Sequence, residues 1–504
     1  MKTISKKILL RGAKAIIGSD LNCDDKVFDI LIEGQTITAI EPMGSIGYAD
    51  EIIDLPGKLL VPGLINGHQH SHEHFQRGRT ENLPLELWMH LVRTRQPIAL
   101  TPRQVYLRTM IGAIECLRTG CTTVVDDMAL GPAIDPARID AAMQAYEDIG
   151  IRALLGFAMM DKPVIDNFPF VLDLVPEKLA NEMRAVTRPD PQDYLALVRR
   201  LTQNHHPKQN RVGVLISASA PQRCTEGFLK QIRGMGDELD LPVITHVQET
   251  RMQVVTGQLF YGMPMIEYLD KIGFLKAGTS LIHAVWLNPR EIAALARTGA
   301  TAQHNPWSNM LLGSGIQPVR PLLEAGVNVS LGSDGSCSTV TVNMLNVVGS
   351  AAAVSKLREQ DFTRWLTAKE ALYAGTVAGA KALGLEKKIG AIQIGATADL
   401  VAYNLNTVTF TPLTDPIRQL VYAERGAGLN FAMVNGDVVI RDAKFARVDE
   451  GKLLKEIEEN YLLLKDQFAS AEADMGPVLK AMEAIYYRSQ ASQIAPDTFA
   501  ARLS

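Results

Sequence analysis

The chain has 504 residues, of which 47% are hydrophobic and 21% are charged. This length and composition suit a globular enzyme with one large core and a smaller satellite domain. The formal net charge is only -4, so overall charge gives no reason to expect nucleic acid or an anionic membrane as a partner. The first apolar run covers only Ile8 to Leu10, and no uncharged stretch of about 18 apolar residues occurs, so neither a signal peptide nor a membrane-spanning helix is expected.

The cysteines indicate a reducing compartment. None of them has the C-x-x-C spacing of a thiolate metal site, and an odd number over this length does not describe a disulfide framework. We therefore expect a cytoplasmic protein. The five positions are Cys23, Cys116, Cys121, Cys224 and Cys337.

Short runs rich in β-branched and apolar residues alternate with longer amphipathic segments, which is the pattern of βα units around a buried parallel sheet. The intervening segments, such as PREIAALARTG, carry apolar residues at helical intervals and end at glycine. Eight such units favour a closed (β/α)8 barrel of the TIM type, although a doubly wound open sheet stays open on alternation alone. The expected strands are Lys58 to Asn66, Thr122 to Asp127, Ile151 to Ala158, Val212 to Ser219, Pro242 to Gln248, Thr279 to Val285, Gly299 to Asn305 and Val327 to Asp334.

Hairpin-like alternation before the first barrel strand and after the last predicts one small β domain built from both chain ends. The final segment is helical in pattern and is expected as an appended extension. We therefore predict a β-sandwich domain from residues 1–60 and 390–447, a barrel from residues 61–389, and a C-terminal helical extension over residues 448–504.

Histidines gather at the ends of the predicted strands, where a barrel of this kind builds its active site. His68, His246, His283 and His304 lie at or just past strand ends, and His70 follows His68 by two residues. Two residues apart on a strand, the imidazoles of His68 and His70 leave the same face and can reach one ion. An H-x-H pair by itself is more often structural, and neutral imidazole suits zinc, iron, nickel or copper alike.

Two carboxylates complete this pattern. Asp334 in SLGSDGS ends the eighth strand and supplies an anionic oxygen that can bind a metal and orient the attacking water. Glu249 in THVQET follows His246 and suits a proton shuttle between that water and a leaving nitrogen. Each residue alone has a plainer explanation, since Asp before Gly forms turns and Glu249 could be an exposed loop residue. Their joint occurrence at successive strand ends favours a catalytic site.

Other polar and aromatic residues are expected near the barrel mouth. His72 and His74 continue the H-x-H alternation, and we interpret them mainly as polar residues of the following loop and helix. His304 and Asn305 at the seventh strand end could reach a substrate. Trp88 could stack on a planar heterocycle, although core packing is slightly favoured for it.

The motifs together resemble the amidohydrolase superfamily, in the branch that contains cytosine and guanine deaminases, S-adenosylhomocysteine deaminase and atrazine chlorohydrolase. The resemblance covers roughly residues 10 to 445. It implies one divalent metal, zinc or alternatively iron, held by His68, His70, His246 and Asp334. It also implies that His283 polarises the attacked group or holds the water, that Glu249 is the general acid and base, and that the protein forms a homo-oligomer. The blocks that carry it are PGLINGHQH, GCTTVVDD, THVQET, YGMPMIEYL, IHAVWL, HNPWSNMLLGSGIQPV and GVNVSLGSDGS.

Two departures from the nucleoside-type members of that branch concern the substrate. SASAPQRCT places Ser219 where a substrate-facing histidine would stand. No Asp or Glu lies between Glu86 and Glu115, where those members tend to carry a residue suited to ribose hydroxyls. Arginines occupy the stretch instead, so we hypothesise a substrate without ribose that bears negative charge. The alternative is that these arginines, Arg93, Arg95 and Arg103, are solvated helix residues.

The sequence therefore favours hydrolytic deamination of an amino-substituted planar heterocycle of the purine, pyrimidine, pterin or triazine type. A second hypothesis keeps the site and changes the leaving group to halide, alkylamine or an amide nitrogen, since these residues do not encode the electrophile. A third, of another class, is a non-catalytic barrel that serves in binding or assembly.

Overall fold

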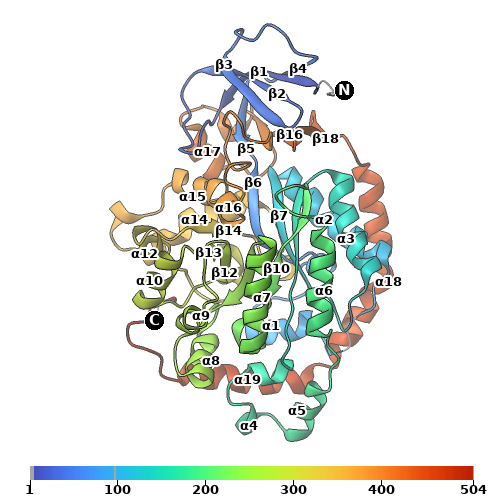
Figure 1. Cartoon of the computed structure of the whole chain (residues 1–504), viewed down its shortest axis with the longest axis vertical. Coiled ribbons are helices and arrows are strands. Elements are labelled where there is room, and N and C mark those ends of the chain that lie inside the picture. Colours follow the sequence, from blue (N-terminus) through green and yellow to red (C-terminus); the bar gives the residue numbers. More distant parts are fainter. Residues whose placement is uncertain (1–4, 96–97, 503–504) are drawn as a thin grey trace.

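The parallel strands of the central domain run in the order of a (β/α)8 barrel in the computed structural model, which describes residues 5–95 and 98–502 (Figure 1). They form two sheets joined through Leu215, and β14 packs against β6 at the other edge, where Asp334 N donates to His68 O at 2.9 Å. One sheet contains β6 (Leu64–Gln69), β7 (Cys121–Met128), β8 (Arg152–Phe157) and β9 (Val212–Val214). The other contains β10 (Ile216–Ala218), β11 (Val243–Val247), β12 (Thr279–His283), β13 (Thr301–His304) and β14 (Val329–Leu331).

Two of the predicted strands are each divided into two. The run from Lys58 to Asn66 breaks at Gly63, whose missing Cβ leaves room for Thr122: an added Cβ would lie 2.0 Å from its Oγ1. The run from Val212 to Ser219 breaks at Leu215, where the chain changes partner from β8 to β11. Residue propensities alone do not reveal such a change of partner, since both halves are equally apolar.

The connecting helices cover the outer face of the strands and end as the sequence predicts. α10 begins with a reciprocal capping box between Asn288 and Glu291 and ends at Gly299, whose φ of 73° favours glycine. The connecting helices and the helices after the last barrel strand are α2 (Pro102–Arg118), α3 (Pro136–Ile149), α6 (Pro191–Thr202), α7 (Glu226–Leu239), α8 (Arg251–Tyr261), α9 (Met265–Lys271), α10 (Pro289–Thr298), α12 (Val319–Glu324), α14 (Met344–Arg358), α15 (Ala368–Ala374), α16 (Val377–Ala382) and α17 (Pro416–Tyr422).

Short helices occupy the connections between these elements, several of them directly after the strands that carry the conspicuous histidines. Those that follow barrel strands are η1 (Ser71–Gln76), α1 (Leu85–Val92), η2 (Val164–Asn167), α4 (Val171–Leu174), α5 (Glu177–Arg184), η3 (Pro221–Arg223), α11 (Pro306–Leu311) and α13 (Ser336–Thr339). Two further short helices are η4 (Phe362–Arg364) and η5 (Val408–Phe410).

Both chain ends contribute to one nine-stranded sheet at the end of the molecule opposite α1, as the hairpin pattern predicts (Figure 1). Its own apolar core includes Leu10, Ile30, Leu60 and Phe431. The hydrogen-bonded order is β18-β17-β16-β15-β5-β1-β2-β3, with β4 paired to β1. The strands are β1 (Lys7–Ala15), β2 (Val27–Glu33), β3 (Thr36–Pro42), β4 (Glu51–Asp54), β5 (Lys58–Pro62), β15 (Leu400–Asn404), β16 (Leu429–Val434), β17 (Asp437–Arg441) and β18 (Lys444–Phe445).

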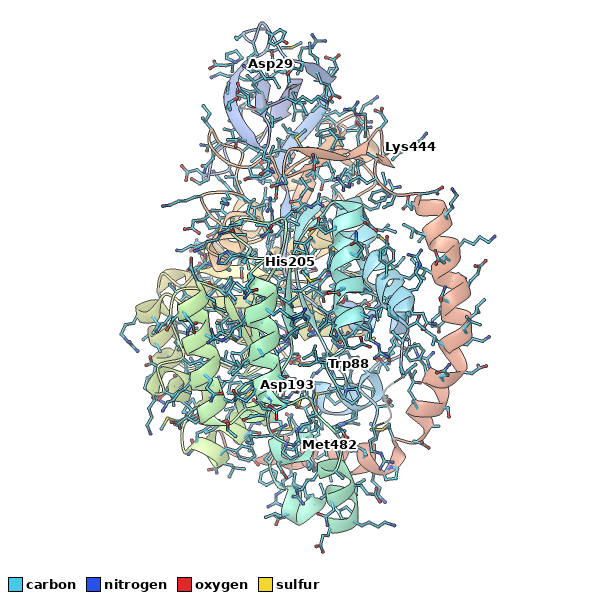
Figure 2. All side chains as sticks on the ribbon, turned by 45° about the vertical axis from the view of Figure 1, so that its right-hand side comes forward. Asp29, Trp88, Asp193, His205, Lys444 and Met482 are labelled. Carbon is cyan, nitrogen blue, oxygen red and sulfur yellow. The ribbon has the colours of Figure 1, made fainter. Side chains whose placement is uncertain are left out.

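The C-terminal helices pack on the barrel of the same chain. α18 (Glu450–Ala473) runs beside α2, and α19 (Gly476–Ala491) crosses α1. Figure 2 shows Met482 of α19 and Trp88 of α1 near one another at the lower end of the molecule, and both belong to one apolar cluster. The extension therefore covers the end of the barrel at which the strands terminate. Among the described residues, no helix is long and apolar enough to cross a membrane.

A buried ion pair connects the barrel to the nine-stranded sheet. Arg152 begins β8, and its Nε and Nη2 donate to the carboxylate of Asp399 at 2.9 and 3.2 Å. The side chains are 6% and 2% exposed, and Asn435 N also donates to Asp399 at 2.7 Å. Removing one member of such a pair leaves a charge buried without a partner.

We predict that Asp399→Ala lowers the free energy of unfolding by about 3–5 kcal/mol, because Arg152 stays buried without the carboxylate that pairs with it. Chemical denaturation measures this change. The control Asp54→Ala removes the partner of Arg11 from an exposed pair, so the unfolding midpoint should stay nearly constant. Equal effects of the two substitutions would contradict the prediction.

Candidate metal centre and active site

Five residues predicted from strand ends converge in one buried cluster. The Nε2 atoms of His68 and His246 lie 3.1 Å apart, and Asp334 Oδ1 lies 3.5 Å from His68 Nε2 and 3.4 Å from His70 Nε2. His283 Nε2 is 3.8 Å from Asp334 Oδ2. The ligand atoms of the three histidines His68, His70 and His246 all lie within 4.8 Å of one another. Residues far apart in the sequence thus meet because their strands all end at the same side of the barrel.

Backbone carbonyl groups determine which ring nitrogen carries the hydrogen in two of these histidines. His70 Nδ1 faces the carbonyl of Asp127 at 2.7 Å, and His246 Nδ1 faces the carbonyl of Ser219 at 2.8 Å. Because a carbonyl oxygen only accepts, each Nδ1 carries the hydrogen, and each Nε2 presents a lone pair to the cluster. In many proteins, a carbonyl group that accepts the hydrogen of one ring nitrogen orients a metal-binding histidine in this way.

Burial keeps these imidazoles neutral. It holds the pKa of His70 and of His246 well below the usual range, and the neighbouring histidines add to the effect. Two neutral Nε2 atoms that face each other at 3.1 Å repel unless a cation or a shared proton lies between them. Three imidazole nitrogens with one carboxylate are a donor set that fits a divalent zinc or iron ion.

The backbone is strained at two of these positions. His283 has a φ of 72° and Asp334 a φ of 68°, a left-handed conformation that costs energy for residues other than glycine. Asp334 is held by Gly335 N, which donates to Oδ1 at 2.8 Å, and by Ser308 Oγ, which donates to Oδ2 at 2.6 Å. The carboxylate is therefore fixed in one orientation toward the histidines.

Glu249 lies beside this cluster in the turn after β11. Its Oε2 is 3.5 Å from His283 Nε2, and Ser314 Oγ donates to Oε1 at 3.4 Å. Burial raises the pKa of Glu249 to about 7; His283 opposes this rise, while Asp334 adds to it. A carboxyl group with this pKa can both accept and donate a proton near neutral pH. His283 itself is oriented by Asn309, whose Oδ1 lies 2.9 Å from His283 Nδ1.

The residues expected to contact a substrate have different surroundings. The Ser219 hydroxyl accepts from Arg223 at 3.1 Å. The Asn305 amide lies 3.4 Å from His283 Nδ1, so it borders the cluster. His304 is buried with no hydrogen-bond partner for either ring nitrogen, and burial lowers its pKa to about 3. Trp88 packs in the apolar cluster of α1 and α19, where its Nε1 donates to Cys337 O at 3.4 Å.

The two further histidines of the H-x-H alternation have structural contacts. His74 Nδ1 donates to Arg108 O at 2.9 Å, and its ring fills the space above Gly112, where an added Cβ would lie 1.9 Å from Cε1. His72 accepts from Ala129 N at 3.2 Å through its Nδ1. The interpretation of both as loop and helix residues agrees with these contacts.

Sequence analysis missed several residues that shape the cluster. The carbonyl of Asp127 orients His70, and burial raises the pKa of its carboxyl group to about 6. The position of Asp127 at the end of the second predicted strand, in GCTTVVDD, could have indicated a residue of the site. Glu73 is also buried near Asp334, and burial raises its pKa to about 8. No sequence feature distinguishes Glu73 from an ordinary helical glutamate.

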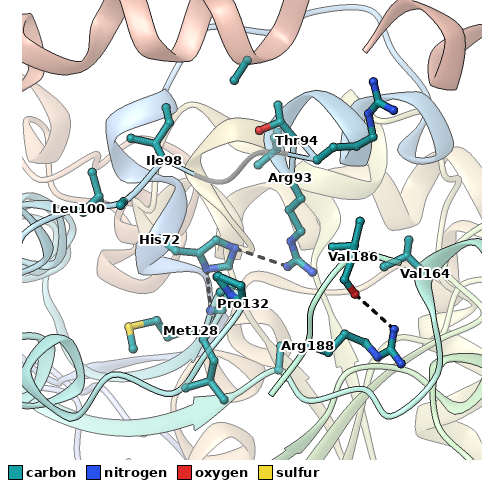
Figure 3. A pocket seen from close by; sticks show the side chains of 18 of the residues that line it. His72, Arg93, Thr94, Ile98, Leu100, Met128, Pro132, Val164, Val186 and Arg188 are labelled. Carbon is teal, nitrogen blue, oxygen red and sulfur yellow. Dashed lines mark hydrogen bonds between the residues drawn. The ribbon is translucent and has the colours of Figure 1, made fainter. Parts of the chain in front are cut away.

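A cavity of about 730 Å³ lies next to the cluster (Figure 3). His72 lines it, whereas the candidate metal ligands do not. The ring centroids of His72 and His70 lie 5.1 Å apart, so His72 connects the wall of the cavity with the cluster. Arg93 and Arg95 line the cavity as well, but the third arginine of that stretch, Arg103, pairs with Glu456 of α18 on the outer surface. For Arg103 these contacts favour the alternative of a solvated helix residue, because its partner Glu456 belongs to the C-terminal extension.

Comparison with known proteins gives a match to the amidohydrolase family over residues 59–439. The 5'-deoxyadenosine deaminase of Methanothermobacter thermautotrophicus is 32% identical over 443 residues, which cover 88% of this chain and 94% of the relative. A 5-methylthioadenosine/S-adenosylhomocysteine deaminase of Pyrococcus furiosus is 33% identical over 426 residues, which cover 84% of this chain and 94% of the relative.

Solved structures share the fold over nearly the whole chain. A zinc-bound adenosine deaminase from Xanthomonas campestris has a TM-score of 0.78 at 24% identity, covering 92% of this chain and 98% of the other. The zinc complex of atrazine chlorohydrolase from Arthrobacter aurescens TC1 has a TM-score of 0.82 at 24% identity, covering 90% of this chain and 100% of the other. These likenesses agree with the barrel architecture described above.

Proposed function

The chain belongs to the amidohydrolase family, and from that premise we propose that it is a metal-dependent deaminase that removes an amino group from a planar heterocycle. It is a hydrolytic enzyme that acts on C–N bonds. The observation that carries the proposal is the position of Glu249, whose carboxyl group lies beside a cluster of inward-facing imidazole nitrogens at 3.5 Å from His283. A proton carrier next to a metal-binding donor set is the arrangement that hydrolytic deamination needs.

His68, His70, His246 and Asp334 would hold one divalent ion, for which we propose zinc, with iron as the alternative. When bound, such an ion lowers the pKa of water to about 7 and so supplies a nucleophile at neutral pH. The lone pairs of His70 and His246 already point inward, because carbonyl groups hold the opposite ring nitrogens. Little rearrangement is then required for binding.

Side chains of this chain carry and position the protons during the reaction. Glu249 accepts a proton from the attacking water and delivers it to the leaving nitrogen, which departs as ammonia. His283 contacts both Glu249 and Asp334 through Nε2, at 3.5 and 3.8 Å, and so orients the water or polarises the attacked ring. The curated names of the relatives favour an adenine-type ring as the reacting group. Pyrimidine, pterin and triazine rings present a similar amino-substituted carbon.

The alternatives differ in what they release. Release of halide or alkylamine would use the same side chains and yield no ammonia, and amide hydrolysis would yield a new carboxylic acid. A non-catalytic barrel would yield no product at all. We also propose a cytoplasmic location, supported by five cysteines that are all unpaired. Assembly as a homo-oligomer stays a prediction that sedimentation measurements can test.

We predict that the purified protein binds about one zinc or iron ion per chain and that a chelator abolishes ammonia release until metal is restored. His246→Ala should lose the metal, since one of its donors disappears. Elemental analysis measures the metal content of each variant.

His205→Ala is the matched control, because His205 precedes β9 and lies away from Trp88 toward the nine-stranded sheet (Figure 2). This variant should keep its metal. Undiminished metal in His246→Ala, or turnover in the fully chelated protein, would contradict the proposal.

We predict that Glu249→Gln lowers kcat by about 100- to 10,000-fold, because the amide cannot carry the proton. Metal content should be unchanged, since Glu249 is not proposed as a ligand. Steady-state ammonia release and elemental analysis on the same preparation separate the two effects. The surface variant Glu267→Gln serves as the control, and a Glu249→Gln enzyme with wild-type kcat would overturn the assigned role.

A further inference from the structure

The cavity next to the cluster, which we call the arginine cavity, is lined by arginines from several elements. It lies among the end of α1, the loops after β7 and β8, and the end of α18. Its volume of about 730 Å³ is in the range of small-molecule sites. Figure 3 shows Arg93 reaching toward His72 in the interior and Arg188 at the opposite wall. The lining arginines are Arg93, Arg95, Arg108, Arg138 and Arg188.

Three of these cations have no ion-pair partner within residues 5–95 and 98–502. Arg95 pairs with Glu182 and Arg138 with Asp135, each at 3.1 Å. No carboxylate lies within ion-pair distance of the described guanidinium groups of Arg93, Arg108 and Arg188. The Nε atoms of Arg93 and Arg108 also lack any hydrogen-bond partner.

The imidazole of His72 lies beside Arg93 but does not accept a hydrogen bond from it. Its Nη2 lies 3.5 Å from His72 Nε2, but His72 Nδ1 already accepts the Ala129 N–H, so the ring hydrogen is on Nε2. Two donors therefore face each other.

Arg108 is half-buried, and its Nε is enclosed. Burial lowers its pKa to about 10, which still leaves the guanidinium charged at neutral pH. The carboxylate of Asp126 acts on it from a distance but is already engaged by Ser71 N at 2.8 Å and Tyr146 Oη at 2.9 Å. A largely enclosed cation without a directly paired carboxylate is costly, so its presence here points to an anion that enters the cavity.

The acidic side chains that line the cavity are occupied elsewhere. Glu472 of α18 binds Arg79 through both oxygens, at 2.9 and 3.0 Å. Asp135 caps α3 by accepting from Ala137 N at 3.0 Å and pairs with Arg138. The unpaired charge that faces the cavity is therefore positive.

We propose that the arginine cavity binds an anionic substituent, a carboxylate or a phosphate, of the same heterocycle whose ring reacts at the metal centre. This proposal rests on the deaminase function proposed above. Guanidinium groups match both anions with paired hydrogen bonds, so Arg93 and Arg108 would fix the far end of the substrate. The substrate class is then an acidic amino-heterocycle, and neutral bases and nucleosides are poorer substrates.

The first test compares substrates that differ by one anionic substituent: pterin against pterin-6-carboxylate, and adenosine against adenosine 5'-monophosphate. For at least one pair, kcat/KM of the wild type should favour the charged member by about ten-fold or more. Arg93→Gln and Arg108→Gln should reduce that preference, and Arg93→Lys should keep part of it because it retains the charge. The carboxylate and phosphate arms identify which anion the cavity takes.

Arg103→Gln is the matched control, since Arg103 lies on the same stretch of chain but pairs with Glu456 on the surface. It should leave the preference of the wild type unchanged. Ammonia release from both members of each pair without any preference for charge would overturn this proposal while the deaminase function stands.

The second test does not depend on turnover. Titration calorimetry of the zinc-loaded protein with benzoate and with inorganic phosphate should show binding that Arg93→Gln and Arg108→Gln weaken by about ten-fold and Arg103→Gln does not. Such arginine-dependent binding without ammonia release from any heterocycle would overturn the deaminase function and support the anion site. Binding that is equal in all variants would place the anion on the metal alone and overturn the arginine cavity.

Discussion

The whole site depends on imidazole nitrogens that converge in a buried space at the strand ends. Carbonyl groups of Asp127 and Ser219 take the Nδ1 hydrogens of His70 and His246, so the lone pairs point inward. Burial keeps the rings of His70 and His246 neutral, and two Nε2 atoms that face each other at 3.1 Å need either a cation or a shared hydrogen between them. The strained backbone at Asp334 brings the one carboxylate needed to balance that cation.

The scaffold makes this convergence possible. The strands deliver their last residues to one end of the barrel, while the buried pair of Arg152 and Asp399 fixes the nine-stranded sheet at the other end. α19 covers the end that carries the site, and α18 supplies Glu472 to Arg79 and Glu456 to Arg103 on the surface. The site thus lies at one end of the barrel, and the ion pair that fixes the nine-stranded sheet lies at the other.

The sequence predicts the strand-end residues well, because strand ends and βα alternation are local patterns and the barrel brings such ends together. The family resemblance is confirmed by the match over residues 59–439. The sequence does not reveal the break at Gly63, the contacts of Arg108, or the partner of Arg103, since each depends on a distant segment that packs against it. The domain boundaries and the roles of the site residues stay predictions.

The most direct test of the central claim is an anomalous diffraction measurement on crystals of the zinc-loaded protein. The account predicts one zinc peak that lies about 2.0–2.2 Å from the Nε2 atoms of His68, His70 and His246 and from one oxygen of Asp334. A peak that excludes Asp334, or one located away from the strand ends, would contradict it.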